Sequence, residues 1–209
     1  LAGRIRATVH LSRGNEKQLL EVFRKVGPDD WVFSTYRSHY HALLKGIPRE
    51  RVMAEILAGH SIHLTFLKHR FYSSAIVGGC LPIALGTALG VKRRGGAERV
   101  WCFVGDMAGR SGAFHEAFQY AKGFDLPLTL VGECNDLSTN TPTHQVWGIP
   151  HSHITVGETV NRQHFDGWLN GGVIWYCYDR ELPHYGVGVR VDFHQVAQPP
   201  AEVRSDVMG

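Results

Sequence analysis

Two runs of apolar residues on either side of one amphipathic segment constrain the fold of this chain more than any other feature. Residues 99–104 (RVWCFV) and 126–133 (LPLTLVGE) are short and almost continuously apolar, which is typical of strands covered on both faces. The segment between them carries apolar side chains at helical spacing: Phe114, Ala117, Phe118 and Ala121. A strand, a helix and a second strand within about 35 residues form a βαβ unit. The sequence therefore predicts an α/β fold with a mostly parallel sheet.

Further elements are predicted from apolar spacing and from the glycines and prolines that bound it. Residues 31–35 (WVFST) begin as a strand, whereas residues 60–78 show no clear period and are predicted to be irregular. The expected helices cover residues 15–27, 48–59 and 80–96. In the last of these helices, Gly86 and Gly90 share one face, a spacing that would let another helix approach closely.

The last third of the chain gives a weaker signal. Residues 141–170 are predicted to be a long loop, and residues 172–180 and 187–193 two strands separated by a turn. Residues 194–209 contain two adjacent prolines and few apolar side chains, which indicates a loose tail. One α/β domain is therefore expected over residues 1–193.

Composition excludes several classes of protein. Charged residues make up 20% of the 209 residues and the net charge is only +3, scattered along the chain, so a nucleic-acid-binding protein is not expected. No apolar run approaches the roughly 20 residues of a membrane-spanning helix. The first residues contain no long apolar run, so a secretory signal is not expected. The four cysteines form no CxxC pair, which favours a reduced, cytoplasmic protein.

Asp106 and Asn135 are the main candidates for a functional site. Each follows the end of a predicted buried strand, and neighbouring strands lie about 4.8 Å apart. A carboxylate and an amide oxygen at adjoining strand ends suit Mg²⁺, which binds oxygen ligands at about 2.1 Å. Phosphate groups of a bound substrate often supply several of these ligands. Backbone N–H groups after Asp106 would then face the phosphate. The alternative is that Asp106 only caps the helix that follows it.

Residues in five collinear blocks carry a family resemblance. GDM at 105–107 and CN at 134–135, with 26 residues between them, are similar to the GDG…NN signature of thiamine diphosphate enzymes. Together with the other blocks, this signature resembles the alpha subunit of the decarboxylating component of 2-oxo acid dehydrogenases over residues 31–141. The other blocks are YRSH (36–39), SIHL (61–64), SSAIVGGCLPIALGTAL (73–89) and FHEAFQYAKGFDLPLTLVGECND (114–136).

The resemblance implies a role for each matching position. It implies that Asp106, the side chain of Asn135 and the main-chain carbonyl of Leu137 hold Mg²⁺. His63 would lie near the reacting carbon, with His60 as a second catalytic candidate, because histidine transfers protons near neutral pH. The residues implied to bind thiamine diphosphate are Tyr36 and Arg37 at the terminal phosphate, Ala75 and Val77 along the cofactor, Gly105, Met107 and Ala108 at the diphosphate, and Thr139 under the thiazolium ring.

Some of these positions have simpler explanations or depart from the signature. His60 and His63 could form ordinary structural hydrogen bonds, and Tyr36 could pack in the core. Met107 replaces a glycine, and a side chain there would be strained if the turn required a positive φ. Cys134 replaces the first asparagine of the signature and Leu137 replaces a common tyrosine.

The resemblance also implies an assembly and a reaction. The expected fold is a three-layer α/β/α domain that binds the diphosphate, and the expected cofactors are thiamine diphosphate and Mg²⁺. A beta-like subunit would supply the pyrimidine-binding domain and the catalytic glutamate in an α2β2 heterotetramer. The expected reaction decarboxylates a 2-oxo acid, or cleaves a related carbonyl substrate, and passes the remaining unit to an acceptor. The alternatives are a transketolase-like or acyloin-forming carboligase subunit, and a cofactor-free scaffold subunit, which Met107 would favour.

Overall fold

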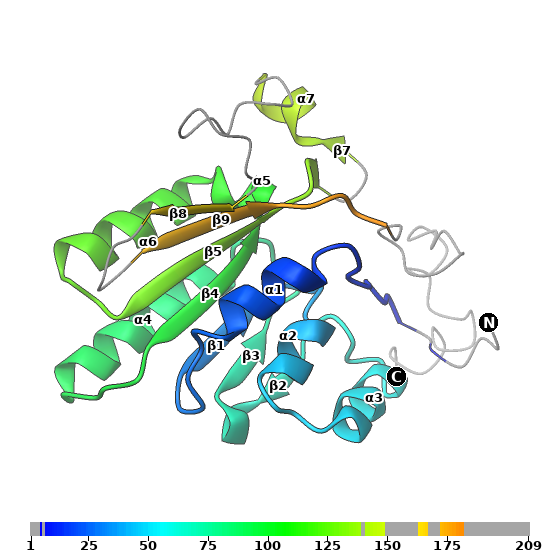
Figure 1. Ribbon diagram of the computed structural model, residues 1–209, viewed down its shortest axis with the longest axis horizontal. Coiled ribbons are helices and arrows are strands. Elements are labelled where there is room, and N and C mark those ends of the chain that lie inside the picture. Colours follow the sequence, from blue (N-terminus) through cyan, green and yellow to red (C-terminus); the bar gives the residue numbers. More distant parts are fainter. Residues whose placement is uncertain (1–4, 6, 139–140, 149–162, 167–171, 182–209) are drawn as a thin grey trace, which may run out of the picture.

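A seven-stranded sheet forms the centre of the computed structural model (Figure 1), which describes residues 5, 7–138, 141–148, 163–166 and 172–181. The strand order is β2-β3-β1-β4-β5-β9-β8. The five inner strands run parallel, and only the edge strands β2 and β8 are antiparallel to their neighbours. The strands are β1 (Trp31–Ser34), β2 (Thr65–Phe66), β3 (Phe71–Ser73), β4 (Val100–Gly105), β5 (Leu128–Cys134), β8 (Gln163–Asp166) and β9 (Val173–Cys177).

The predicted βαβ unit is confirmed. β4 and β5 pair in parallel from Val100 opposite Leu128 to Gly105 opposite Glu133, and α6 (Gly112–Gly123) connects them. Both strands are buried along almost their whole length, as the continuous apolar runs predicted. The fold is therefore the expected α/β fold with a mostly parallel sheet.

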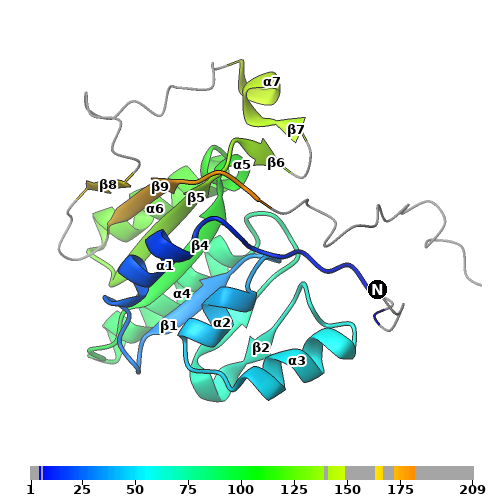
Figure 2. The same ribbon diagram turned by 45° about the vertical axis from the view of Figure 1, so that its right-hand side comes forward.

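Helices cover both faces of the sheet, which gives three layers (Figure 2). On one face, α4 (Cys80–Arg93) and α6 pack against alternate residues of β4 and β5, such as Cys102 and Leu130. On the other face, α1 (Glu16–Phe23), α2 (His39–Leu44) and α3 (Arg49–Leu57) bury their apolar side chains with Phe103 and Val131. The alternation of side chains along each strand supplies one core per face.

Several short elements differ from the prediction. Residues 60–78 are not irregular throughout, because they contain β2, a 3₁₀ turn η1 (Leu67–His69) and β3, which pairs in parallel with β1. The expected loop at 141–170 contains β7 (Thr141–Pro142), α7 (Thr143–Trp147) and β8, and β7 pairs with β6 (Leu137–Ser138). Elements of two to five residues are too short to show a helical or strand period.

The remaining predictions concern the glycine face of α4, the C-terminal segments, membrane-spanning helices and the cysteines. A methyl group built on Gly86 or Gly90 would meet no atom within 4 Å, so the expected close approach of another helix is not made within the described part of the chain. The predicted strand at 187–193 and the tail at 194–209 lie outside the described residues, and the domain limits stay a prediction. None of the described helices is long and apolar enough to cross a membrane. All four cysteines are free thiols.

Two glycines make room for one indole ring. Trp175 on β9 is the register partner of Gly132 on β5. A methyl group on Gly132 would overlap the Trp175 ring, and so would one on Gly109 in α5 (Asp106–Gly109). The absence of side chains at these two positions therefore sets how closely β9 and α5 pack on β5.

We expect Gly132→Ala to lower the free energy of unfolding by about 3 kcal/mol, since overpacking a filled site forces the ring or the strand to move. Urea unfolding followed by circular dichroism measures the change. Gly86→Ala is the control, because it also adds one methyl group but into open space, and its stability should stay the same or rise slightly. Equal losses in the two variants would contradict the packing argument.

Candidate functional site

The carboxyl ends of four neighbouring parallel strands meet at one edge of the sheet and surround a cavity. Residues directly after β1, β4, β5 and β9 all line it, among them Arg37, Asp106, Asn135 and Tyr178. Ligands of open α/β sheets bind in this position, outside the carboxyl ends of the strands. Most residues predicted from the sequence to bind a cofactor line this cavity: Tyr36, Arg37, Val77, Gly105, Asp106, Met107, Ala108, Asn135 and Leu137.

Four other predicted site residues are placed differently. Ala75 is exposed and does not line the cavity, although its neighbours Ser74 and Ile76 do. Thr139 lies outside the described residues. His60 and His63 are exposed and away from the cavity lining. The His60 ring contacts the Glu55 carboxylate at 2.7 Å and lies 5.3 Å from the His63 ring, centroid to centroid. A catalytic role for either histidine stays a prediction.

Asp106 is a buried carboxylate at the end of β4. It is only 4% exposed, and its Oδ1 accepts a hydrogen bond from the backbone N–H of Met107 at 3.0 Å. Burial raises the pKa of Asp106 to about 6, against the opposing effect of backbone N–H groups of Met107 and Asn135. Gly105, not Asp106, is the N-cap of α5, so capping does not account for this carboxylate. A buried carboxylate at a cavity wall is suited to a cation.

Asn135 is held in one orientation by two hydrogen bonds. Its Oδ1 accepts the backbone N–H of Leu137 at 3.1 Å, and its Nδ2 donates to the hydroxyl group of Tyr178 at 2.9 Å. A backbone N–H can only donate, so Oδ1 must face Leu137. An amide oxygen has two lone pairs, and the second lone pair of Oδ1 is suited to a metal ion.

Two further side chains with metal-binding atoms, those of Cys134 and Asp136, lie close to Asp106. The side chains of Cys134 and Asp136 each place a ligand atom within 4.8 Å of the others and of Asp106. The thiol of Cys134 lies 3.9 Å from Asp106 Oδ2, and contact with Cys177 together with burial raises the pKa of Cys134. Sequence reasoning did not include Cys134 or Asp136 in the site. Their position next to Asn135 was the available signal.

Arg37 and Tyr36 follow β1 and also line the cavity. The backbone of Arg37 is fixed because its N–H donates to Thr35 Oγ1 at 3.2 Å and its carbonyl accepts from Ser12 at 3.1 Å. Its Nη1 donates to Tyr178 at 3.3 Å. The Tyr36 ring packs edge-on against His10, and burial raises the pKa of Tyr36. Tyr36 thus both packs, as the simpler explanation expected, and lines the cavity.

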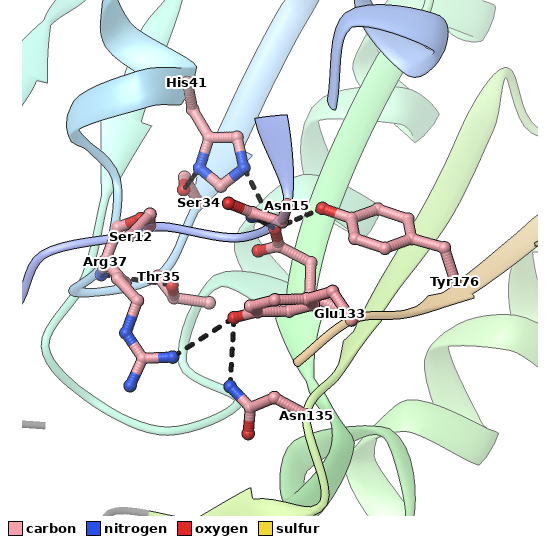
Figure 3. Close-up of polar contacts among 10 residues, drawn as sticks. Ser12, Asn15, Ser34, Thr35, Arg37, His41, Glu133, Asn135 and Tyr176 are labelled. Carbon is pink, nitrogen blue, oxygen red and sulfur yellow. Dashed lines mark hydrogen bonds and ion pairs between the residues drawn. The ribbon is translucent and has the colours of Figure 1, made fainter. Parts of the chain in front are cut away.

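A buried polar network that the sequence did not reveal is centred on Glu133, which also lines the cavity (Figure 3). Oε1 of Glu133 accepts hydrogen bonds from Asn15 Nδ2, at 3.1 Å, and from the Tyr176 hydroxyl group. His41 Nε2 lies 3.4 Å from the same oxygen, and the other ring nitrogen of His41 contacts Ser34 at 2.7 Å. The network ties α1, α2, β1, β5 and β9 together beside the cavity.

Met107 does not strain the turn after β4. It lies within α5 and is not among the described residues with positive φ, so a side chain at this position has no backbone penalty. Its Sδ accepts a hydrogen bond from Trp147 Nε1 at 2.9 Å, which links α7 to α5. The replacement of glycine by methionine therefore does not argue against a ligand in the cavity.

The cavity combines two kinds of charge. Asp106 and Asn135 contribute hard oxygen donors to the lining, and Arg37, which carries a guanidinium group, also lines the cavity. Oxygen donors bind a divalent cation, and a guanidinium group binds phosphate or carboxylate oxygens. The arrangement is suited to an anion held both directly and through a metal ion.

Comparisons with known proteins agree with the resemblance. A family model described as "Dehydrogenase E1 component" matches residues 2–151. The alpha subunit of the pyruvate dehydrogenase E1 component of Porphyra purpurea is 32% identical over 168 residues, 72% of this chain and 49% of that protein. The alpha subunit of the acetoin:2,6-dichlorophenolindophenol oxidoreductase of Bacillus subtilis (strain 168) is 34% identical over 144 residues, 64% of this chain and 43% of that protein.

The chain thus spans about half the length, or less, of these relatives. The family match nevertheless covers well over half of this chain, and it includes every described strand from β1 to β5 and the residues of the cavity on them. This chain belongs to the dehydrogenase E1 component family.

Proposed function

We propose that this chain is the diphosphate-binding, alpha-type subunit of an enzyme that uses thiamine diphosphate and Mg²⁺ to act on a 2-oxo acid or a related carbonyl compound. One observation carries the proposal: oxygen donors after β4 and β5 and a guanidinium group after β1 share one cavity. Membership of the E1 family and the names of the relatives, pyruvate dehydrogenase and acetoin oxidoreductase, support the same reaction class.

The residues present fit the proposed cofactor and metal. Asp106, Asn135 Oδ1 and the carbonyl of Leu137 would hold Mg²⁺, and Arg37 with Tyr36 would hold the terminal phosphate. The backbone from Gly105 to Ala108 would face the diphosphate, and Val77 would contact the cofactor. When bound, thiamine diphosphate supplies a carbon nucleophile and an electron sink for cleaving the bond next to a carbonyl group. The contribution of this chain is to bind and orient the diphosphate end.

We infer that a beta-like subunit completes the site in an α2β2 assembly. It would carry the pyrimidine-binding domain and the catalytic glutamate. Large apolar side chains lie exposed on the cavity-lining segment that leads into α4 and on α4 itself, which supports a partner on this side: Ile76 is 73% exposed, Val77 60% and, within α4, Ile83 45%. Exposed apolar groups next to a binding cavity are typical of an interface.

Calorimetric titration tests the cofactor proposal. The full-length chain, purified with the subunit that accompanies it, should bind thiamine diphosphate in the presence of Mg²⁺ and lose binding when a chelator removes the metal. A complex that takes up no thiamine diphosphate under saturating Mg²⁺ would contradict the proposal and favour the scaffold alternative.

The substrate needs a separate experiment, because the pyruvate dehydrogenase and acetoin oxidoreductase subunits have similar sequence identities to this chain, 32% and 34%. A panel of pyruvate, branched 2-oxo acids and acetoin, assayed with an artificial electron acceptor, distinguishes the two candidate activities. Turnover of a 2-oxo acid with release of CO₂ supports the dehydrogenase. Cleavage of acetoin without release of CO₂ would indicate the second candidate function, an acetoin oxidoreductase.

A further inference from the structure

Tyr178 lies between Arg37, the proposed phosphate-binding residue, and Asn135, a proposed metal ligand. It follows β9 directly, is 6% exposed and lines the cavity. Its backbone N–H donates to the carbonyl of Cys134 at 2.9 Å, which continues the pairing of β9 with β5. The pairing of β9 with β5 therefore fixes the backbone position from which the Tyr178 side chain extends.

The hydroxyl group of Tyr178 accepts two hydrogen bonds, from two residues that lie far apart in the sequence. Arg37 Nη1 donates to it at 3.3 Å and Asn135 Nδ2 at 2.9 Å. Figure 3 shows the side chains of Arg37 and Asn135 pointing toward the same place from two different segments of the chain. A phenolic oxygen has two lone pairs and one proton. The two donors use the lone pairs, so the proton can be donated to a group bound in the cavity.

A phenol group is ordinarily protonated near neutral pH. A neutral phenol can accept from both cationic and amide donors and still donate one proton. A phenolate could not donate.

We propose that Tyr178 is a positioning residue that ties the phosphate-binding guanidinium group of Arg37 to the metal-binding carboxamide of Asn135. The inference rests on the proposed function, because it takes the ligand of the cavity to be a diphosphate bound with Mg²⁺. Arg37 follows β1 and Asn135 follows β5, two strands that β4 separates, and each side chain has rotatable bonds that a free side chain would sample. One hydroxyl group bonded to both fixes their separation before the ligand arrives, which favours binding through preorganisation.

Tyr176 provides a matched comparison. It lies two residues earlier, on the same face of β9, and is also buried. Its hydroxyl group bonds to Glu133, which lines the cavity, whereas Tyr176 itself does not line it. The two tyrosines differ in what their hydroxyl groups hold, so removal of each hydroxyl group separates a role in ligand binding from a role in stability.

Titrations of Tyr178→Phe and Tyr176→Phe test the proposal in the full-length chain purified with its accompanying subunit. The probes are thiamine diphosphate and, separately, inorganic pyrophosphate, each with saturating Mg²⁺. Tyr178→Phe should raise the Kd for both probes about tenfold, the effect of losing one well-placed hydrogen-bond anchor. It should also raise the Mg²⁺ concentration needed for half-saturation. Tyr176→Phe should change these affinities by less than about twofold and should instead lower the unfolding midpoint.

A double-mutant cycle with Arg37→Lys adds a measure that general loosening of the fold would not change. If Tyr178 acts by holding the guanidinium group, the loss in pyrophosphate affinity from Tyr178→Phe should be smaller in the Arg37→Lys background. Equal losses in both backgrounds, or unchanged affinity in Tyr178→Phe, would overturn the proposal. Binding of pyrophosphate but not of thiamine diphosphate by the wild type would count against the proposed function alone, since the pyrophosphate cycle still decides the role of Tyr178.

Discussion

Replacing Asp106 with alanine is expected to weaken Mg²⁺-dependent binding of thiamine diphosphate by at least about a hundredfold. The carboxylate is the charged member of the proposed ligand set, because Asn135 and Leu137 contribute neutral oxygens. Loss of groups that only support a metal ligand already reduces metal affinity by about 10- to 100-fold, so loss of the ligand itself should have at least the larger effect. Calorimetric titration with and without Mg²⁺ measures the difference.

Two further variants give this experiment its controls. Asp106→Asn keeps the shape and one oxygen but removes the charge, and its loss should fall between those of the wild type and Asp106→Ala. Glu116→Ala removes one carboxylate from the exposed face of α6, outside the cavity lining, and should leave the affinity unchanged. A wild-type affinity in Asp106→Ala would remove Asp106 from the metal site.

The sheet and its functional edge could be predicted because the sequence signal is local. β4 and β5 are six and seven residues long and almost wholly apolar, and α6 between them has an apolar stripe. Once two such strands are known to be parallel, their carboxyl ends share one edge, and residues after them must lie near each other. The placement of Asp106 and Asn135 on one cavity follows from this rule alone.

Short elements could not be predicted in the same way. α2 has six residues and β3 has three, which is too few for a helical or strand period to appear. Tertiary pairing forms them, as the parallel register of β3 with β1 shows. A side chain at Met107 would be strained only at a positive φ, and the chain after β4 instead forms a turn of helix in which Met107 is not among the residues with positive φ. The glycine of the family signature does not reveal this conformation.

The buried contacts beside the cavity were also hidden from the sequence. Asn15 reaches Glu133 across 118 positions of the chain, and Arg37 reaches Tyr178 across 141. Such pairs depend on the order of strands in the sheet, in particular on β9 lying next to β5. Local patterning does not contain that order. Apolar runs therefore located the edge of the site, whereas the network that supports the site required the fold.

Glu133 is the shared hydrogen-bond acceptor of that network. Removing its side chain should therefore lower the free energy of unfolding more than the other substitutions proposed. Glu133→Ala is expected to lower the free energy of unfolding by about 3–5 kcal/mol, since it leaves the buried partners of the carboxylate without their shared acceptor. Urea unfolding measures the loss. Glu16→Ala, which removes an exposed carboxylate from α1, serves as the control and should change stability by less than about 1 kcal/mol.

The same carboxylate should make stability depend on pH in the acid range. Burial acts to raise the pKa of Glu133, but the charge and contact of His41 and the hydrogen bond from Tyr176 outweigh it, so the pKa in the folded chain is lowered from its ordinary value of 4.5. A lowered pKa means that the unfolded chain takes up the proton first as pH falls. The stabilisation is therefore complete above pH about 4.5 to 5 and is lost as pH falls through the folded-state pKa.

Glu133→Gln separates this titration from the packing of the side chain, because glutamine fills the same space but cannot ionise. Its stability between neutral pH and pH about 3 should fall less steeply than that of the wild type, and urea midpoints measured across this range give both slopes. Parallel pH profiles for the two proteins would show that other carboxylates cause the acid sensitivity. A shallower profile in Glu133→Gln would instead assign the acid sensitivity to the ionised carboxylate of Glu133, which joins β5, α2 and β9 at the wall of the cavity.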